Sequence, residues 1–149
     1  MEIGEDTHRE LAVSLNGEVW SLLEKNDRTD EDDRLMTHAA HASLYHWLQV
    51  GTAVNEQRGE WMVSHVYATL GLGESALRHA ERCAKVTERH LDEMKDFDIA
   101  YASECLARAY ATLGNKERSD ALREKARQLG SQIADDEDRK IFEGDLADW

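Results

Sequence analysis

Apolar residues recur along this chain at intervals of three and four, which is the spacing of one face of an α-helix. Polar or glycine-rich stretches interrupt the pattern and divide it into seven expected helices. Their ranges are about 7–25, 31–49, 53–70, 74–93, 96–113, 117–132 and 136–146. The chain contains no proline, which favours continuous helices over a β-rich or loop-rich protein. The sequence therefore predicts an all-α fold of six to seven helices.

Residues that favour helix N-termini stand at several of these boundaries. Thr7 followed by Glu10 has the spacing of a capping box, Thr29 or Asp30 precedes the second helix, and Thr52 precedes the third. Short connections between helices favour antiparallel neighbours. We therefore expect a single domain over residues 1–149, with helix pairs at about 7–49, 53–93 and 96–132. A short helix at about 136–147 would cap the end.

One five-residue segment occurs twice. Tyr-Ala-Thr-Leu-Gly stands at 67–71 and again at 110–114, each time at the end of one helical pattern and before another. Such an internal repeat indicates stacked helical hairpins. Glycine accepts the left-handed backbone that a helix C-terminus often needs, so Gly71 and Gly114 are predicted to turn the chain. We expect Tyr67 and Tyr110 to pack between the helices of each pair.

The repeated unit resembles a tetratricopeptide-type repeat (TPR). The resemblance depends on the tyrosine, the turn glycine and small residues in the second helix of the pair. The matching positions are Tyr67, Gly71, Ala76 and Cys83 in the first copy, and Tyr110, Gly114, Ser119 and Ala126 in the second. It implies antiparallel helix pairs in a right-handed stack, which commonly binds peptides along its concave surface.

This chain also departs from the TPR pattern. The family repeats about every 34 residues, whereas the two copies here, which begin at Tyr67 and Tyr110, are 43 residues apart. The proline that usually ends each unit of the family is also missing. The family has a tryptophan near the start of the first helix of each unit. The matching positions here hold Glu60 and Ser103, so this tryptophan has no counterpart. The resemblance is therefore to a TPR-like protein over roughly 53–129, with the first two helices as a degenerate pair.

A narrower resemblance covers the second and third helices. The chain is similar to a family of small, uncharacterised bacterial TPR-like proteins, which implies a cytoplasmic setting and no particular activity. The segments that carry this similarity are His38-Ala-Ala-His-Ala-Ser43, Tyr45-His-Trp47, Gly51-Thr52, Asn55, Arg58-Gly-Glu-Trp61 and Val66-Tyr-Ala68.

The net charge of −13 argues against two classes of partner. Nucleic acids and anionic membrane surfaces both attract basic proteins, so neither is expected to bind here. No apolar segment approaches the length of a membrane span, and the acidic N-terminus does not resemble a signal peptide. A cytoplasmic protein is the expectation.

Two cysteines, Cys83 and Cys105, lie inside helical patterns and are expected to be buried reduced thiols. His79, Cys83 and His90 share one face of the fourth helix, which leaves a metal site as an alternative. Cys83 falls at a small-residue position of the repeat, however, where packing is the more common role.

Polar and aromatic side chains at helical spacing mark a candidate site. One group follows a face of the second helix and another follows the third, so antiparallel packing would bring the two groups together. The expected ligand- or partner-binding residues are His38, His41, Tyr45, Arg58, Trp61 and His65. Arginine grips carboxylates in a bidentate manner, so this site could hold a peptide end.

A metal is the alternative for this cluster. His38 and His41 lie one turn apart and could bind zinc or nickel, with a third ligand from His46, His65 or Glu60. No His-Glu-x-x-His motif supports such a site. Histidines that hydrogen-bond across a helix interface explain the pattern more simply, and no cofactor is expected.

The sequence contains no nucleophile elbow and no glycine-rich phosphate loop, which favours a non-enzymatic protein. We expect a protein- or peptide-interaction module, and the acidic chain favours a basic peptide. The first alternative is a small-molecule or metal-binding helical bundle centred on the cluster of His38, His41, Arg58 and Trp61. A homo-oligomer that uses exposed aromatic residues such as Trp20 and Trp149 is the second.

Overall fold

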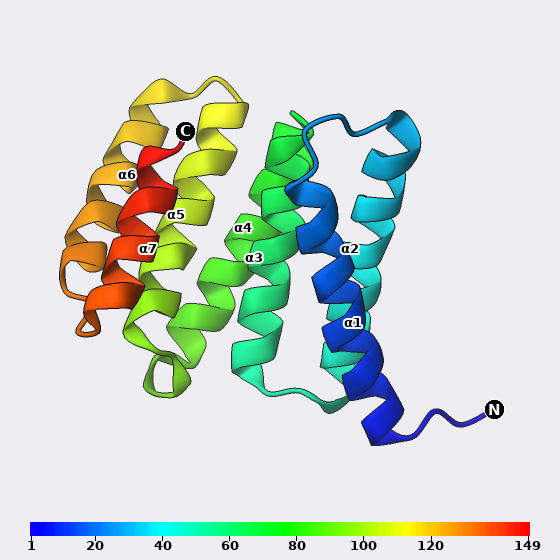
Figure 1. The fold of residues 1–149 in the computed structure, drawn as a ribbon. Coiled ribbons are helices and arrows are strands. Elements are labelled where there is room, and N and C mark those ends of the chain that lie inside the picture. The colour runs from blue at the N-terminus through cyan, green and yellow to red at the C-terminus, as the bar shows by residue number, and fades with distance from the viewer.

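The computed structural model describes residues 1–149 as seven α-helices without any strand (Figure 1). A single turn of 3₁₀-helix, Leu91–Glu93, precedes the fifth helix. The helices are α1 Glu5–Leu23, α2 Asp30–Val50, α3 Ala53–Thr69, α4 Gly73–Arg89, α5 Asp96–Thr112, α6 Lys116–Ser131 and α7 Asp136–Ala147. The prediction of an all-α fold with seven helices is confirmed. None of these helices combines the length and the apolar character needed to cross a membrane.

Successive helices pack as three antiparallel hairpins, α1/α2, α3/α4 and α5/α6 (Figure 1). The last helix, α7, lies against α5 and α6. The core follows this order in three clusters, the first between α1, α2 and α3, the second between α3, α4 and α5, and the third between α5, α6 and α7. Their central residues include Val19, Met36 and Val63, then Ala76, Ala80 and Cys105, then Ala126, Ile133 and Phe142.

Each hairpin contains one serine hydroxyl that donates to an alanine carbonyl of the partner helix. Ser43 on α2 donates to Ala12 on α1 at 2.7 Å. In the second hairpin Ser64 on α3 donates to Ala76 on α4 at 2.7 Å. In the third, Ser119 on α6 donates to Ala107 on α5 at 2.8 Å. Only small residues at the crossing allow a side chain to reach the opposite backbone, so these bonds mark close helix contact.

The repeated segment ends both α3 and α5 in the same hydrogen-bonded turn. Gly71 and Gly114 have φ values of +77° and +80°, the only positive φ values in the chain. After α3, the Leu72 N–H donates to the Tyr67 carbonyl at 2.9 Å, and the Gly71 N–H donates to the Ala68 carbonyl at 3.0 Å. The second copy repeats both bonds. These two bonds define a Schellman motif, so the predicted turning role of the two glycines is confirmed.

We expect Gly114→Ala to lower the free energy of unfolding by about 1 kcal/mol, because the left-handed backbone at this position disfavours a Cβ atom. No atom lies within 4 Å of the Cβ that alanine would add, so backbone strain alone would cause the loss. Gly144→Ala is the matched control, because it also meets open space but lies within α7. In that variant the free energy of unfolding should rise by up to about 1 kcal/mol. Urea denaturation measures both, and equal effects of the two substitutions would contradict the assignment.

Two boundaries differ from the expected ones. The predicted capping box of Thr7 and Glu10 is wrong, because α1 begins at Glu5 after Gly4, and acidic residues in its first turn face the positive end of the helix dipole. The fourth helix ends at Arg89 instead of reaching the predicted limit near residue 93. Leu91, just beyond this end, is 52% exposed, so it makes no core contact that would hold a further turn of helix.

The cap expected at the second helix is confirmed. Thr29 accepts from the Asp32 N–H at 3.2 Å, and the Asp32 carboxylate accepts from the Thr29 N–H at 3.0 Å. The Asn55 side chain likewise accepts from the Thr52 N–H at 3.0 Å before α3. The starts of α2 and α3 are therefore fixed by local hydrogen bonds.

Candidate functional site

The six predicted site residues do not form one cluster, and that part of the prediction is wrong. Arg58 and Trp61 line a cavity on one side of α3, whereas His41 and Tyr45 line a cavity on its other side. The reason is the orientation of α2, which packs on α3 mainly through its apolar residues, while its His41 meets α3 at Tyr67 and not at Arg58 or Trp61. The central helix α3 therefore contributes to two distinct sites.

The first cavity, which we call the aromatic groove, has a volume of about 390 Å³. It is formed by α1, α3, α5 and α7, which are the first helix of every hairpin together with the terminal helix. Its lining residues are Asn16, Trp20, Gln57, Arg58, Trp61, Met62, Phe97, Asp98, Tyr101, Ile141 and Asp145. Four helices that are distant in sequence thus contribute to one surface.

Trp61 lies at the centre of the groove and contacts aromatic rings on both sides. The Trp20 ring stacks near it with 6.2 Å between centroids, and the Tyr101 ring meets it edge-on at 5.6 Å. Trp20 is 41% exposed, so its ring is open to a partner. Flat rings of this kind provide large apolar contact area and attract cations to their faces.

The guanidinium of Arg58 is already occupied. Its Nε and Nη2 donate to the two carboxylate oxygens of Asp98 at 2.8 and 3.1 Å, and the guanidinium lies over the Phe97 ring at 5.2 Å. Asp98 also accepts from the Lys95 N–H at the start of α5. The sequence suggested that Arg58 grips a carboxylate of a partner, but the structure assigns this bidentate contact to Asp98. Arg58 therefore links α3 to α5.

A carboxylate that forms no salt bridge, that of Asp145, lies at the edge of the aromatic groove. Asp145 on α7 accepts a hydrogen bond from the Tyr101 hydroxyl at 2.5 Å. Burial, together with this carboxylate, raises the pKa of the Tyr101 hydroxyl, so the phenol stays protonated and remains a donor. The Asp145 residue itself is exposed. With Arg58 neutralised by Asp98, Asp145 gives the groove a net negative charge.

Below the groove, a buried acid anchors Trp61. The Trp61 indole N–H donates to Glu104 Oε1 at 3.1 Å, and Arg108 Nε donates to Glu104 Oε2 at 2.9 Å. Glu104 is fully buried, and this burial raises the pKa of its carboxyl against the opposing effect of Arg108. The His65 ring stacks on Trp61 at 4.8 Å. Trp61 is therefore held in place from below while its other face lines the groove.

The second cavity, which we call the histidine–arginine pocket, lies between α2, α3 and α4 and has a volume of about 450 Å³. His79 Nδ1 donates to the Glu60 carboxylate at 2.6 Å, and both side chains are buried. His41 Nε2 is hydrogen-bonded to the Tyr67 hydroxyl at 2.8 Å, and the Tyr67 ring stacks on His79. The tyrosine of the repeat is thus part of a polar pocket as well as a packing residue.

The remaining predicted ligands are dispersed. His38 is exposed on α2, and His46 is hydrogen-bonded to His8 at 2.8 Å. His90 is paired with Glu93, while Cys83 is a buried free thiol, as is Cys105. No group of three histidine, cysteine, aspartate or glutamate side chains in the structure could hold a metal ion. The metal alternatives therefore have no geometry to support them.

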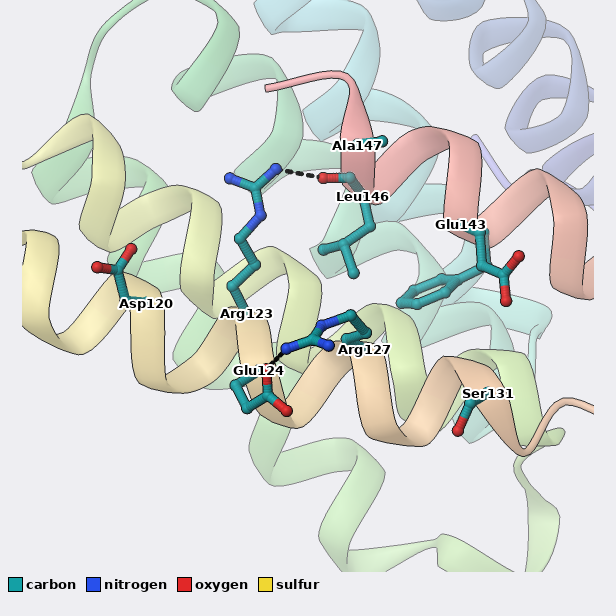
Figure 2. Close-up of a pocket in the computed structure, with 9 residues that line it drawn as sticks. Asp120, Arg123, Glu124, Arg127, Ser131, Glu143, Leu146 and Ala147 are labelled. Carbon is teal, nitrogen blue, oxygen red and sulfur yellow. Dashed lines mark hydrogen bonds and ion pairs between the residues drawn. The ribbon is translucent and has the colours of Figure 1, made fainter.

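A third cavity of about 440 Å³ lies along the seam between α6 and α7 (Figure 2). Figure 2 shows Arg123 extending to the Leu146 carbonyl and Arg127 pairing with Glu124. Arg123 also lies over the Trp149 ring at 4.2 Å, and Arg108 contacts the same ring at 5.1 Å. Trp149 is therefore covered by arginines instead of being an exposed contact residue, as the oligomer hypothesis had assumed. Arg123 thus attaches α7 to α6, whereas the pair of Arg127 and Glu124 lies within α6.

No family model, curated protein or solved structure matches this chain. Its function must therefore be inferred from the geometry of the sites described above.

The sequence did not reveal Asp98, Tyr101 and Asp145 as lining residues of the groove, nor Glu104 as the buried acid beneath it. One signal could have revealed them. Trp61 and Glu104 are 43 residues apart, as are the two copies of the repeated segment, and they are in contact. Residues at equivalent positions of stacked repeats lie side by side, so the repeat period itself predicts which residues of α3 and α5 meet.

Proposed function

We propose that this chain is a non-enzymatic, TPR-like peptide-interaction module that binds a basic segment of a partner protein in the aromatic groove. The observation that carries the proposal is the composition of the groove from one helix of every hairpin and from α7. In a right-handed TPR-like stack these first helices form the concave inner surface, where extended or helical peptides bind. A cytoplasmic location and a bacterial source remain expectations of the resemblance.

The chemistry of the groove favours a basic occupant. Trp20, Trp61 and Tyr101 offer ring faces, and Asp145 offers a carboxylate beside them. A lysine or arginine side chain can place its apolar stem on the rings and its charge near the acid. The net charge of −13 attracts a basic peptide over a longer range and raises its association rate.

Selection from a random peptide library tests the proposal. We expect peptides that combine lysine or arginine with an apolar residue to be enriched on the immobilised protein. Trp20→Ala should weaken the best peptide about tenfold, because an exposed tryptophan commonly carries a large share of the binding energy. Leu35→Ala is the control, since Leu35 is also an exposed apolar residue but lies on α2 outside the groove.

Asp145→Asn tests the charge preference separately. The asparagine oxygen can still accept from Tyr101, so the groove keeps its shape while it loses its free charge. Affinity for the basic peptide should fall about threefold at low salt, with a smaller loss at high salt. Fluorescence anisotropy with a labelled peptide measures the affinities of the Trp20→Ala and Asp145→Asn variants. Failure to enrich any peptide, or equal binding by Trp20→Ala and Leu35→Ala, would contradict the proposed function.

A further inference from the structure

We infer that the histidine–arginine pocket is a binding site for a small organic molecule that carries a phosphate or carboxylate group. This site lies across α3 from the aromatic groove and has different lining residues. The pocket contains His41, Leu44, Tyr45, Leu48, Glu60, Tyr67, Ser75, Arg78, His79 and Arg82. Its volume of about 450 Å³ falls within the range of small-molecule sites.

Two arginines supply the positive charge. Arg78 and Arg82 lie one turn apart on α4 and both line the pocket. Neither is among the residues that form salt bridges in the structure. Guanidinium forks match the geometry of phosphate and carboxylate oxygens.

The only acid that lines the pocket is already satisfied. Glu60 accepts the Nδ1 proton of His79, so this carboxylate is buried and faces the His79 ring. The same bond fixes the orientation of the His79 ring and leaves Nε2 free to donate to an anion when the ring is protonated. Glu60 therefore orients the ring of His79 within the site.

The electrostatic surroundings of His41 agree with this assignment. Burial is the main cause that lowers the pKa of His41, and the neighbouring His79, His38 and Arg82 lower it further, while Glu60 alone opposes them. A bound anion would compensate this excess of positive groups. Protonation of His41 should therefore become easier when the ligand binds.

Apolar side chains complete the pocket and indicate the remainder of the ligand. Leu44, Tyr45 and Leu48 lie on α2 opposite the arginines, and Tyr45 and Leu48 are 57% and 53% exposed. An aromatic or aliphatic body could cover these residues while its anionic group contacts α4. The site thus favours an organic anion over inorganic phosphate.

Nuclear magnetic resonance titration of the histidine ring signals tests the site. The probes are inorganic phosphate, phenyl phosphate and benzoate, each added at constant pH and ionic strength. We expect phenyl phosphate or benzoate to shift the His41 and His79 signals at lower concentration than inorganic phosphate. The comparison of phenyl phosphate with benzoate identifies the preferred anionic group. Unchanged His41 and His79 signals with all three probes would overturn the inference.

Variants separate a specific site from general attraction of anions. The double substitution Arg78→Gln/Arg82→Gln should weaken binding at least about tenfold. Both arginines are exposed, so the variant should fold, and circular dichroism confirms this. Arg127→Gln on α6 is the control, since it replaces one arginine by glutamine outside the pocket and is compared with each single variant, Arg78→Gln and Arg82→Gln. An equal loss in the control, or none in the double variant, would refute the site and leave the proposed groove unaffected.

Discussion

Substitution of His65 by phenylalanine should make the stability of this protein much less sensitive to acid. Between about pH 6.5 and pH 3 the natural chain is expected to lose up to about 4 kcal/mol of unfolding free energy through this one residue. The His65→Phe variant should lose correspondingly less over the same interval. Urea denaturation at pH 7.5, 6, 5 and 4 measures the difference.

The physical reason is the burial of an imidazole without a partner. His65 lies against Trp61, and its Nδ1 is buried with no hydrogen bond. Burial, with the charge of Arg108 adding to it, lowers the pKa of His65 from 6.5 to about 3. Between these two values the unfolded chain takes up a proton that the folded chain rejects. Stability is therefore complete above pH 6.5 and falls as the pH decreases towards 3.

Other groups do not obscure this comparison. Glu104 has a raised pKa and therefore an opposite pH dependence, but it is present in the natural chain and in the variant alike. Phenylalanine keeps the stacking on Trp61 and removes the unpaired nitrogen, which offsets strain from its slightly larger ring. His38→Gln is the control, because His38 is exposed on α2. Identical pH profiles for the natural chain and His65→Phe would show that His65 is not buried in solution.

The second large effect concerns Glu104. We expect Glu104→Ala to lower the free energy of unfolding by about 3–5 kcal/mol, because it leaves partly buried donors of Trp61 and Arg108 without their acceptor. The substitution also creates a cavity beneath the aromatic groove. Peptide binding should weaken in the same variant, since Trp61 loses the bond that orients its ring.

A double-mutant cycle distinguishes the ion pair from the cavity. If the cost arises from an unpaired charge, then the double variant Glu104→Ala/Arg108→Ala should lose less unfolding free energy than the sum of the losses in the two single variants. Glu117→Ala, an exposed acid on α6, should change stability by no more than about 0.5 kcal/mol. Urea unfolding at pH 7 gives all four values. A loss below about 1 kcal/mol for Glu104→Ala would contradict the buried position of this carboxylate.

The elements of the fold could be predicted from sequence because their signals are local. The apolar spacing gave the helices, and the five-residue repeat gave the two glycine turns with Gly71 and Gly114 in left-handed conformation. The small residues Ala76, Ser119 and Ala126 are buried at the helix crossings, as expected. These features depend only on neighbours within a few residues or on one helix pair.

The site could be predicted only in part. The sequence placed Arg58 and Trp61 in one site with the histidines of α2, whereas Arg58 and Trp61 line the aromatic groove and His41 lines the histidine–arginine pocket. The rotation of α2 about its own axis is poorly encoded, because Ala39, Ala40 and Ala42 make several of its faces suitable for packing. A helix that can turn several faces to the core does not reveal where His41 will point. Glu60 and His79 are polar residues that would be expected on the surface, yet both are buried. Their hydrogen bond to each other, which the sequence does not reveal, makes this burial possible.

The serine bonds of the second and third hairpins show how a structural bond can survive duplication while its residues change. Positions 64 and 76 hold serine and alanine, and the equivalent positions 107 and 119 hold alanine and serine. A column-by-column alignment of the two repeats scores two mismatches here. The hairpins nevertheless share one hydroxyl-to-carbonyl bond at the same crossing, with donor and acceptor helices exchanged. Repeats of this kind are therefore better compared by their interhelical pairs than by single positions.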